Sequence, residues 1–567
     1  MAGSQDEDSR IAEGIYDPSV RTLYGALRVF DPDVVQSILD LVANLDGLSL
    51  RLAREKEYRH DIGNVNPSLW GIVRRLWAAI TLAHEERDLE NAPNLFDLCQ
   101  SLAKFTRNLV AAEPANQKRT FENEPYMRAL VYQYTSYTAM QDVNSFAATR
   151  MLVQALSNLV TANDPLAQEL WQAYLNLPEE QLILLRLFGS PDDRTIVSTL
   201  VFILNCIHGK PERMRLLLSS PRGPRVCIGM LDRLNALVDA DESSDLGKAF
   251  EVGYQVFAEL TSEGLLPELY DTLAIDEEVI TPHQTTLLKI LDSYLQTSPS
   301  DQQAHISGTL VQMLISIFFT LSTYAQEAIQ RSLGPGNADD HESPIETVTT
   351  PLSNGLNHSD VSDTPVAPAA LQELDLLLPK VCEALVLVAQ SLTTLILRVE
   401  GSSKDGSSNE PGTSAKQSVN AAASPSGEGL VESLVKTLRF LDIFVPRITF
   451  GKVVERPAPP GSTAQPGSAQ TSSAQSPPPG FNYVKRDLVR LLGTLAADSR
   501  DVQDRMRACG GIPAVMNLCV VDDQNPCTEH AIFALRNLLH ENKENQAVVD
   551  AIKPVGRWDE RHVLQGL

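Results

Sequence analysis

The sequence predicts an all-α protein, an armadillo/HEAT-like right-handed helical solenoid with disordered insertions. One sequence pattern, which we call the helical phrase, consists of a helix followed at a fixed interval by the first turn of the next helix. It recurs along the chain at spacings between 43 and 50 residues, close to the period of about 40–47 residues in armadillo and HEAT repeats. Leucine-rich runs are common and long alternating β-branched segments are scarce, which argues against extended sheets. Units of this kind bury their apolar faces only by stacking on their neighbours.

The clearest copies of the phrase lie between Phe481 and Pro554. A helix is expected to run to Gly493-Thr494-Leu495, and Val502-Gln503 begins eight residues after Thr494. A second helix runs to Arg536-Asn537-Leu538, and Asn545-Gln546 follows Asn537 at the same interval. The two copies are 43 residues apart, so we expect two stacked repeats here.

The residues between these helices suit helix ends. Ser499 and Asn542 are expected to cap the first turn of the next helix with a short polar side chain. Gly510-Gly511 can adopt a positive φ, which we assign to Gly511, and Pro513 suits the opening of a helix. Helical spacing also predicts a buried apolar stripe, formed by Ile532, Leu535, Leu538 and Leu539.

The same phrase returns in the N-terminal half. Arg107-Asn108-Leu109 precedes Asn116-Gln117 at the interval found near the C-terminus, with Pro114 six residues past the asparagine. Asn205 also has a proline six residues on, Pro211, and Ser157-Asn158-Leu159 is a looser copy with Pro165 one residue late. We therefore interpret the chain as one interrupted array.

Three segments of low complexity interrupt the array. They are rich in Pro, Ser, Gly, Ala, Asn and Gln and contain too little apolar surface to offset the conformational entropy of ordering them. The expected order is a disordered N-terminus at 1–14, an armadillo-like array at 15–333, a disordered insertion at 334–369, solenoid helices at 370–400, an insertion at 401–427, solenoid helices at 428–454, a Pro/Ser-rich linker at 455–480, armadillo repeats at 481–554 and a tail at 555–567.

Composition narrows the function. A net charge of −25 and a pI near 4.8 disfavour nucleic acid and favour protein partners with basic or extended segments. The polar, acidic start of the chain lacks a signal sequence, so we expect a cytoplasmic protein. The apolar window from Leu374 to Leu397 raises a membrane alternative, but Pro379, Lys380 and Glu383 interrupt it, which favours a buried helix and no membrane partner. Homo-oligomer formation stays open.

No motif points to catalysis or to a cofactor. The chain has no GxxxxGK[ST], HExxH or GxSxG motif and no dinucleotide-binding fingerprint. The seven cysteines are scattered within apolar phrases, as reduced core thiols would be. Cys519, Cys527 and His530 lie close in sequence, but a closed zinc site needs four ligands. We predict no enzyme, no cofactor and no metal site.

The C-terminal segment Tyr483–Pro554 closely resembles the C-terminal domain of the ataxin-10 family. The resemblance is carried by five short motifs, Lys485-Arg486-Asp487-Leu488, Gly493-Thr494-Leu495, Gly510-Gly511-Ile512-Pro513, Asp522-Asp523-Gln524-Asn525-Pro526 and Ala531-Ile532-Phe533-Ala534-Leu535-Arg536-Asn537-Leu538. With its low-complexity insertions, the chain resembles a fungal-type homologue. The resemblance implies an armadillo-like, non-enzymatic cytoplasmic protein with a role in cytokinesis.

Two functions compete at this point. The first is a scaffold that binds proteins during cell division. The second is a peptide-carrying or signalling adaptor of the importin-α/β-catenin type, in which asparagine amides grip an extended peptide. Such adaptors place an aromatic residue four positions before each asparagine, but only Phe533 fits, because Lys104, Gln154 and Val201 hold the other places. This favours the scaffold.

Candidate contact residues follow from the third helix of each unit, which is expected to line the concave face. The candidates for partner binding are Phe533, Arg536, Asn537, Arg107 and Asn108. The alternative for the asparagines is a hydrogen bond to the adjacent repeat. Five Ser/Thr-Pro dipeptides in the insertions are candidate phosphorylation sites, at Ser343, Thr350, Thr364, Ser424 and Ser476.

Overall fold

The chain forms two compact helical units, Met1–Leu273 and Ala274–Leu567. The division falls inside the segment 15–333, which the sequence predicts as one array. The computed structural model describes residues 17–65, 68–87, 93–298, 307–333, 375–404, 415–445, 447–449, 452–453, 481, 483–523, 526–552, 556–558 and 564–566.

Among the described residues of unit 1, the regular elements are all helices. Proline in the first turn opens many of these helices, where its missing N–H costs nothing. The helices are α2 (Pro18–Arg28), α3 (Val35–Arg54), α4 (Lys56–Gly63), α5 (Leu69–Glu85), α6 (Pro93–Val110), α7 (Pro114–Thr120), η2 (Phe121–Asn123), α8 (Glu124–Tyr134), η3 (Ala139–Gln141), α9 (Val143–Val160), α10 (Asp164–Leu175), η4 (Glu179–Gln181), α11 (Ile183–Phe188), α12 (Asp193–Ile207), α13 (Pro211–Ser219), α14 (Gly223–Leu237), α15 (Asp245–Ser262) and α16 (Leu266–Thr272).

Unit 2 adds two short antiparallel strand pairs to its helices, β1 with β2 and β3 with β4. Its elements are α17 (Pro282–Thr297), α18 (Ser307–Leu333), α19 (Leu378–Lys404), α20 (Ala415–Ala421), α21 (Leu430–Phe444), β1 (Ile448–Thr449), β2 (Lys452–Val453), α22 (Val484–Ala496), α23 (Arg500–Ala508), α24 (Gly511–Leu518), α25 (Thr528–Leu539), α26 (Lys543–Ala551), β3 (Gly556–Trp558) and β4 (Leu564–Gly566).

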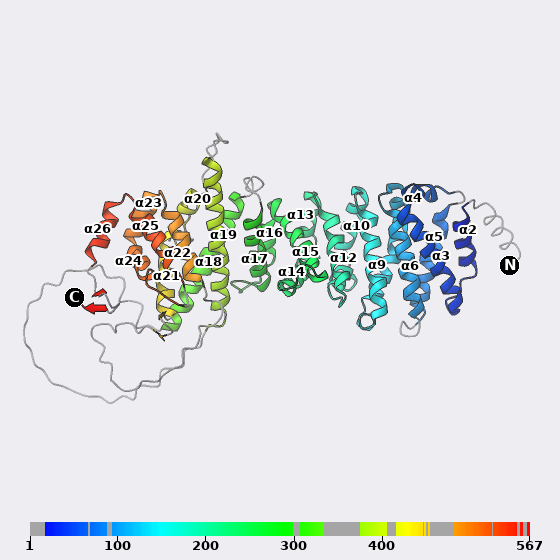
Figure 1. Cartoon of the computed structure of the whole chain (residues 1–567), viewed down its shortest axis with the longest axis horizontal. Helices are drawn as coiled ribbons and strands as arrows, with labels where there is room; N and C mark the ends of the chain where they lie inside the picture. The colour runs from blue at the N-terminus through cyan, green and yellow to red at the C-terminus, as the bar shows by residue number, and fades with distance from the viewer. Residues whose placement is uncertain are drawn as a thin grey trace, which may run out of the picture. The chain divides into compact units, whose positions relative to one another are not determined.

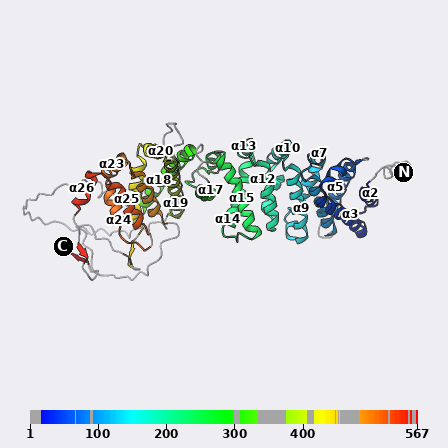
Figure 2. The ribbon, with the colours of Figure 1, turned by 45° about the horizontal axis from the view of Figure 1, so that its top comes forward.

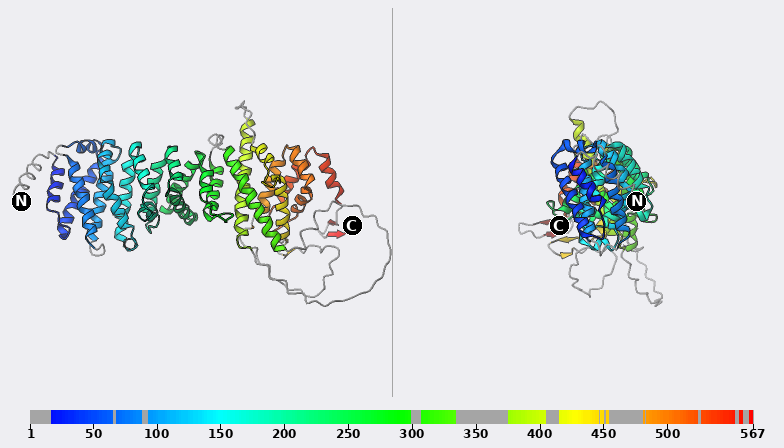
Figure 3. Two further views of the ribbon diagram at one scale, coloured as in Figure 1. Left: turned by 180° about the vertical axis from the view of Figure 1, so that it is seen from behind. Right: turned by 90° about the vertical axis from the view of Figure 1, so that its right-hand side faces the viewer.

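One long helix from each repeat stacks on its counterpart in the next. In unit 1, α3, α6, α9, α12 and α15 pack in that order, and α9, α12 and α15 lie side by side in two views (Figures 1 and 2). In unit 2, α19, α22 and α25 pack in the same way, and the C-terminal helices are seen stacked from behind in Figure 3. The all-α, armadillo/HEAT-like prediction is confirmed.

The repeat register read from the sequence is confirmed at the start of the following helix. Five stacking helices carry an equivalent residue, which we call the rung residue, at Asn108, Asn158, Asn205, Thr494 and Asn537. In every copy the next helix begins six residues after the rung residue, at Pro114, Asp164, Pro211, Arg500 and Lys543.

The turn between these helices has a feature that the sequence did not reveal. Four residues after each rung residue the backbone has a positive φ, although only one of these positions is glycine. A left-handed conformation is costly for a residue with a Cβ atom, so the repeat geometry imposes it. The φ values are 58° at Ala112, 56° at Ala162, 62° at Gly209, 51° at Asp498 and 53° at Glu541.

Two helix-end assignments require correction. The residue with positive φ near the start of α24 is Gly510, at 66°, whereas Gly511 is the first residue of the helix. Asn542 caps α26, because its side chain accepts a hydrogen bond from the Asn545 N–H. Ser499 stands at the N-cap position of α23 but makes no side-chain capping bond.

The expected insertion at 401–427 is wrong in part. Helix α19 continues to Lys404, and residues 415–421 form α20. Ala415 and Val419 of α20 are buried, and this helix packs on α18 and α19. Composition concealed α20, because its apolar contacts come from two small side chains spaced one turn apart. The insertions at 334–369 and 455–480 lie outside the described residues.

Two helices of unit 2 are long and apolar enough to cross a membrane, at Gly308–Leu333 and Leu378–Arg398. In their most apolar windows, 56% and 61% of the residues are buried within the fold. Since α18 and α19 pack on each other, and α18 also packs on α21, this burial is that of core helices.

Candidate functional site

Side-chain amides of the rung asparagines link neighbouring repeats. Asn108 Nδ2 donates to the Ser49 carbonyl on α3 at 3.0 Å, and Asn158 Nδ2 donates to the Arg107 carbonyl on α6 at 3.1 Å. We call Asn108, Asn158, Asn205 and Asn537 the amide ladder. The amides of its other two members also donate to the preceding stacking helix. Asn205 Nδ2 donates to the Ser157 hydroxyl at 2.9 Å, and Asn537 Nδ2 donates to the Gly493 carbonyl at 2.9 Å.

A second set of side-chain amides, from glutamines, donates hydrogen bonds to main-chain carbonyls of the next stacking helix. Gln117 Nε2 donates to the Asn158 carbonyl at 2.9 Å. In unit 2, Gln503 Nε2 donates to the Asn537 carbonyl at 2.9 Å. These glutamines follow the rung residues Asn108 and Thr494 by nine positions, so Asn158 and Asn537 are each bonded to two helices of the preceding repeat, to one through the side chain and to the other through the main chain. The recurrent Asn and Gln of the sequence therefore serve inter-repeat cohesion.

The five candidate contact residues are not equivalent. Asn108 and Asn537 direct their amides into the ladder, as the alternative interpretation expected. Arg107 is half-buried, and its Nη1 donates to Gln154 Oε1 at 2.6 Å on the next stacking helix. Phe533 is 45% exposed, and Arg536 is also exposed. Only these last two present a largely uncommitted side chain to solvent.

The predicted apolar stripe on α25 is only partly correct. Leu538 is fully buried, but Ile532 is 56% exposed, and Leu535 and Leu539 are intermediate. The buried stripe is instead Ala531, Ala534 and Leu538, which faces α22.

A buried lysine, Lys485, links two of the short C-terminal motifs, its own and the one that contains Asp522. Lys485 is 1% exposed, and its ammonium lies 3.4 Å from Asp522 Oδ2 and 3.7 Å from Asp442 Oδ1. Asp522 Oδ1 also accepts the Ile448 N–H at 3.3 Å, and the Asp523 N–H donates to the Ile448 carbonyl at 2.7 Å. The cluster joins α22, the connector before α25 and the segment after α21. These charges are structural.

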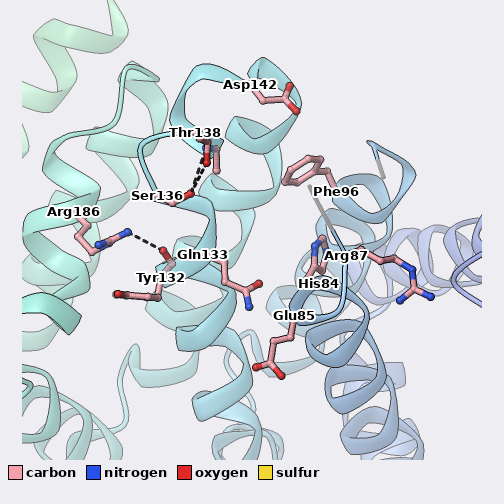
Figure 4. A pocket seen from close by; sticks show the side chains of 11 residues that line it. His84, Glu85, Arg87, Phe96, Tyr132, Gln133, Ser136, Thr138, Asp142 and Arg186 are labelled. Atoms are coloured by element: carbon pink, nitrogen blue, oxygen red, sulfur yellow. Dashed lines mark hydrogen bonds between the residues drawn. The ribbon is translucent and has the colours of Figure 1, made fainter. Parts of the chain in front are cut away.

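A cleft with a volume of about 490 Å³ opens in unit 1 between α5, α8 and α11 (Figure 4). At its wall, His84 Nε2 lies 2.7 Å from the Tyr134 hydroxyl, and burial lowers the pKa of His84 to about 4. Arg186 stacks on the Tyr132 ring and donates to the Tyr132 carbonyl at 3.1 Å. The histidine is neutral near pH 7 and bonded to a tyrosine, so the cleft offers hydrogen bonds rather than an activated nucleophile.

The cysteines lie in buried or partly buried surroundings. All seven are unpaired, and burial raises the pKa of Cys99, Cys206, Cys227 and Cys382 to about 12. Cys519 and Cys527 direct their Sγ atoms to main-chain carbonyls at 3.5 Å. Within the described ranges, no group of three His, Cys, Asp or Glu side chains is arranged to hold a metal ion.

Of the candidate phosphorylation sites, only Ser424 lies among the described residues. Its N–H donates to the Glu428 carbonyl at 2.8 Å and its carbonyl accepts the Gly427 N–H at 2.9 Å, in a tight turn before α21. Its hydroxyl lies 2.8 Å from that of Ser426. A kinase would need to open this turn. Ser343, Thr350, Thr364 and Ser476 lie outside the described residues.

Comparison with known proteins identifies the C-terminal region. Residues 484–567 match the family described as the spinocerebellar ataxia type 10 protein domain. A segment of 73 residues is 41% identical to "Ataxin-10 homolog" of Dictyostelium discoideum, covering 13% of this chain and 12% of that protein. A segment of 79 residues is 35% identical to human "Ataxin-10", covering 14% of this chain and 17% of that protein. The chain thus matches less than a fifth of the length of these relatives.

Solved structures that are similar over most of the length of the chain include the SYS-1/POP-1 complex. The similarity to it has a TM-score of 0.30 at 12% identity and covers 95% of this chain and 69% of that one. A structure described as a phosphorylation switch controlling the interaction between cadherin and beta-catenin has a TM-score of 0.23 at 11% identity, covering 92% of this chain and 98% of that one.

Proposed function

Since residues 484–567 form an ataxin-10-type domain, we propose that this chain is a non-enzymatic scaffold that binds protein partners in the regulation of cytokinesis. The observation that carries the proposal is the amide ladder. The polar groups that repeat along the chain hold helices to one another, which makes a stable surface for other proteins rather than a site for chemistry.

Charge indicates the kind of partner. The net charge of −25 favours association with proteins that present basic or extended segments. Phe533 and Arg536 are candidate contacts on this surface, because aromatic and arginine side chains are frequent anchors of protein interfaces. A cytoplasmic location accords with this role.

The adaptor alternative is less well supported. In a peptide groove, the positions four residues before the rung asparagines would carry aromatic rings. Here Lys104 Nζ donates to Asp46 Oδ1 at 3.0 Å, and Gln154 Nε2 donates to the Ser198 hydroxyl at 3.2 Å. These positions cross-link neighbouring stacking helices, and the asparagine amides are committed as well.

The proposal can be tested by affinity capture of the full chain from dividing and from resting cells, followed by mass spectrometry. We expect a partner set that is enriched in the dividing cells and contains cytokinesis proteins. A set that is the same in both states, or one dominated by transport cargo, would sink the proposal.

The candidate contacts have their own test in the double substitution Phe533→Ala with Arg536→Ala. Loss of partners with an unchanged melting temperature is the expected result, because both side chains are exposed. Undiminished capture would remove these two residues from the binding surface, and a lowered melting temperature would assign them a structural role.

A further inference from the structure

The last stacking helix, α25, exposes apolar side chains at positions that are buried in the other stacking helices. Ile532 lies five residues before its rung residue, Asn537, and is 56% exposed. The residues at the same place in the other copies are apolar and fully buried, with 0% exposure: Ala103, Val153, Leu200 and Val489. A position that is otherwise buried between consecutive repeats is open to solvent in the last one.

The rest of this face shows the same change. Leu535 and Leu539 lie two residues before and two residues after Asn537, and both are partly exposed. Their counterparts are at most 1% exposed, at Thr106, Leu156, Ile203 and Leu492 for the first position and Val110, Val160, Ile207 and Ala496 for the second. Together with the neighbouring Phe533, we call Ile532, Leu535 and Leu539 the end face.

A polar group beside the end face also lacks its usual partner. Gln117 and Gln503 donate to a carbonyl of the following stacking helix. Gln546 occupies the equivalent place, nine residues after Asn537. Its Nε2 donates to the Leu539 carbonyl of its own repeat at 2.8 Å, and this hydrogen bond is exposed to solvent. The last repeat therefore has the residues of an internal repeat, whereas terminal repeats of solenoids usually carry a polar outer face.

Among the described residues, no helix follows α26, which ends at Ala551. The described residues beyond it, Gly556–Trp558 and Leu564–Gly566, pair as strands. The described part of the chain therefore supplies no helix that continues the stack beyond α25.

We propose that the end face binds an amphipathic helix of a partner protein, which takes the place of the next stacking helix. The α22–α25 contact describes the chemistry of that helix. It needs a stripe of small or branched apolar residues, like Ala531, Ala534 and Leu538, and a side-chain amide placed like Asn537. The amide would donate to the Arg536 carbonyl, and Gln546 would turn to donate to the partner's main chain.

Charge refines this description of the partner. Glu529 and Arg536 flank the end face on exposed positions. A partner helix with a basic residue toward Glu529 and an acidic residue toward Arg536 would pair with both. The inference rests on the scaffold function proposed above and assigns one partner surface to it.

The test uses the full chain and a labelled peptide of residues 526–552, which supplies the required stripe and amide. The peptide is stapled to hold its first helix and carries Ile532→Glu and Phe533→Lys, so that it cannot stack on itself. Fluorescence anisotropy should show saturable binding, weakened at least tenfold when the chain carries Ile532→Asp with Phe533→Asp. Val520→Asp, at a position 50% exposed outside the end face, is the matched control and should leave binding unchanged.

Two outcomes would overturn the proposal. The first is an absence of saturable binding to a chain whose melting curve is normal. The second is concentration-dependent self-association in sedimentation that Ile532→Asp with Phe533→Asp abolishes, because a second copy would then be the occupant. If the peptide fails while capture still recovers division-stage partners, only this inference falls and the scaffold function stands.

Discussion

Asn537 on α25 donates its side-chain amide to the main-chain oxygen of Gly493 on α22 across 2.9 Å. The bond joins two repeats at the place where the sequence repeats itself most clearly. The Asn537 carbonyl accepts from Gln503, so a single residue is held from two directions. The repetition in the sequence thus has a direct physical purpose, which is cohesion between helices.

We predict that Asn537→Ala lowers the free energy of unfolding of the C-terminal repeats by about 1 kcal/mol, the usual net contribution of one hydrogen bond. Arg536→Ala, one residue earlier and exposed, should change stability by less than about 0.5 kcal/mol. Native-state hydrogen exchange of α22 and α25 measures both. Equal losses in the two variants would show that the amide contributes nothing specific.

A second prediction concerns the turn after each rung residue. Ala162 has a φ of 56°, where a Cβ atom is disfavoured and glycine is not. Ala162→Gly should therefore stabilise unit 1 by roughly 1 kcal/mol. The control is Ala155→Gly within α9, which should destabilise by about 1 kcal/mol or more. Denaturant unfolding followed by fluorescence compares them, and a loss of stability in both variants would contradict the assignment.

These examples separate what the sequence could show from what it could not. Asn108 and Asn537 with their following helix starts could be predicted, because an Asn-Gln pair follows each asparagine at the same interval and Pro114 marks the start of the first of these helices. The positive φ at Ala112, Ala162 and Glu541 left no such signal, since packing between repeats imposes it on ordinary residues. The exposure of Ile532 was also invisible, because its spacing is that of a buried residue and only the end of the stack leaves it uncovered.

A third prediction follows from the corrected helix end at α24. Gly510→Val should cost about 1–3 kcal/mol, because Gly510 has a φ of 66° and an added Cβ would lie 2.5 Å from Arg439 Nη2. Gly511→Ala should cost less, because Gly511 does not have a positive φ; the added Cβ would displace the flexible side chain of Met506 and would also lie 2.9 Å from Val435 Cγ2. Pro513→Ala should stay within about 0.5 kcal/mol. Thermal melts rank the three variants, and a larger loss at Gly511 than at Gly510 would contradict the ranking.

The buried cluster at Lys485 makes a fourth prediction. Lys485→Met leaves the carboxylate of Asp522, which is 4% exposed, without its ammonium partner, and we expect a loss of about 3–5 kcal/mol. Lys485→Met combined with Asp522→Leu removes both charges and should recover part of that loss. The two residues would not be coupled if adding Asp522→Leu lowered the stability of the Lys485→Met variant by as much as Asp522→Leu alone lowers that of the unsubstituted chain.

The last prediction concerns the acid response of unit 1. His84 is 3% exposed, and burial lowers its pKa from 6.5 to about 4. The unfolded chain therefore binds a proton at this histidine as the pH falls through 6.5, while the folded chain stays neutral until about pH 4. Folding stability is lost over this interval, by roughly 3 kcal/mol in total, and the loss levels off below it.

His84→Gln keeps an acceptor for the Tyr134 hydroxyl and cannot titrate, so its unfolding free energy should fall less over the same range. Denaturant unfolding at pH 7, 6, 5 and 4 isolates the histidine as the difference between the two curves, because acid titration of the carboxylates is common to both. Parallel curves would show that His84 titrates alike in the folded and unfolded chain.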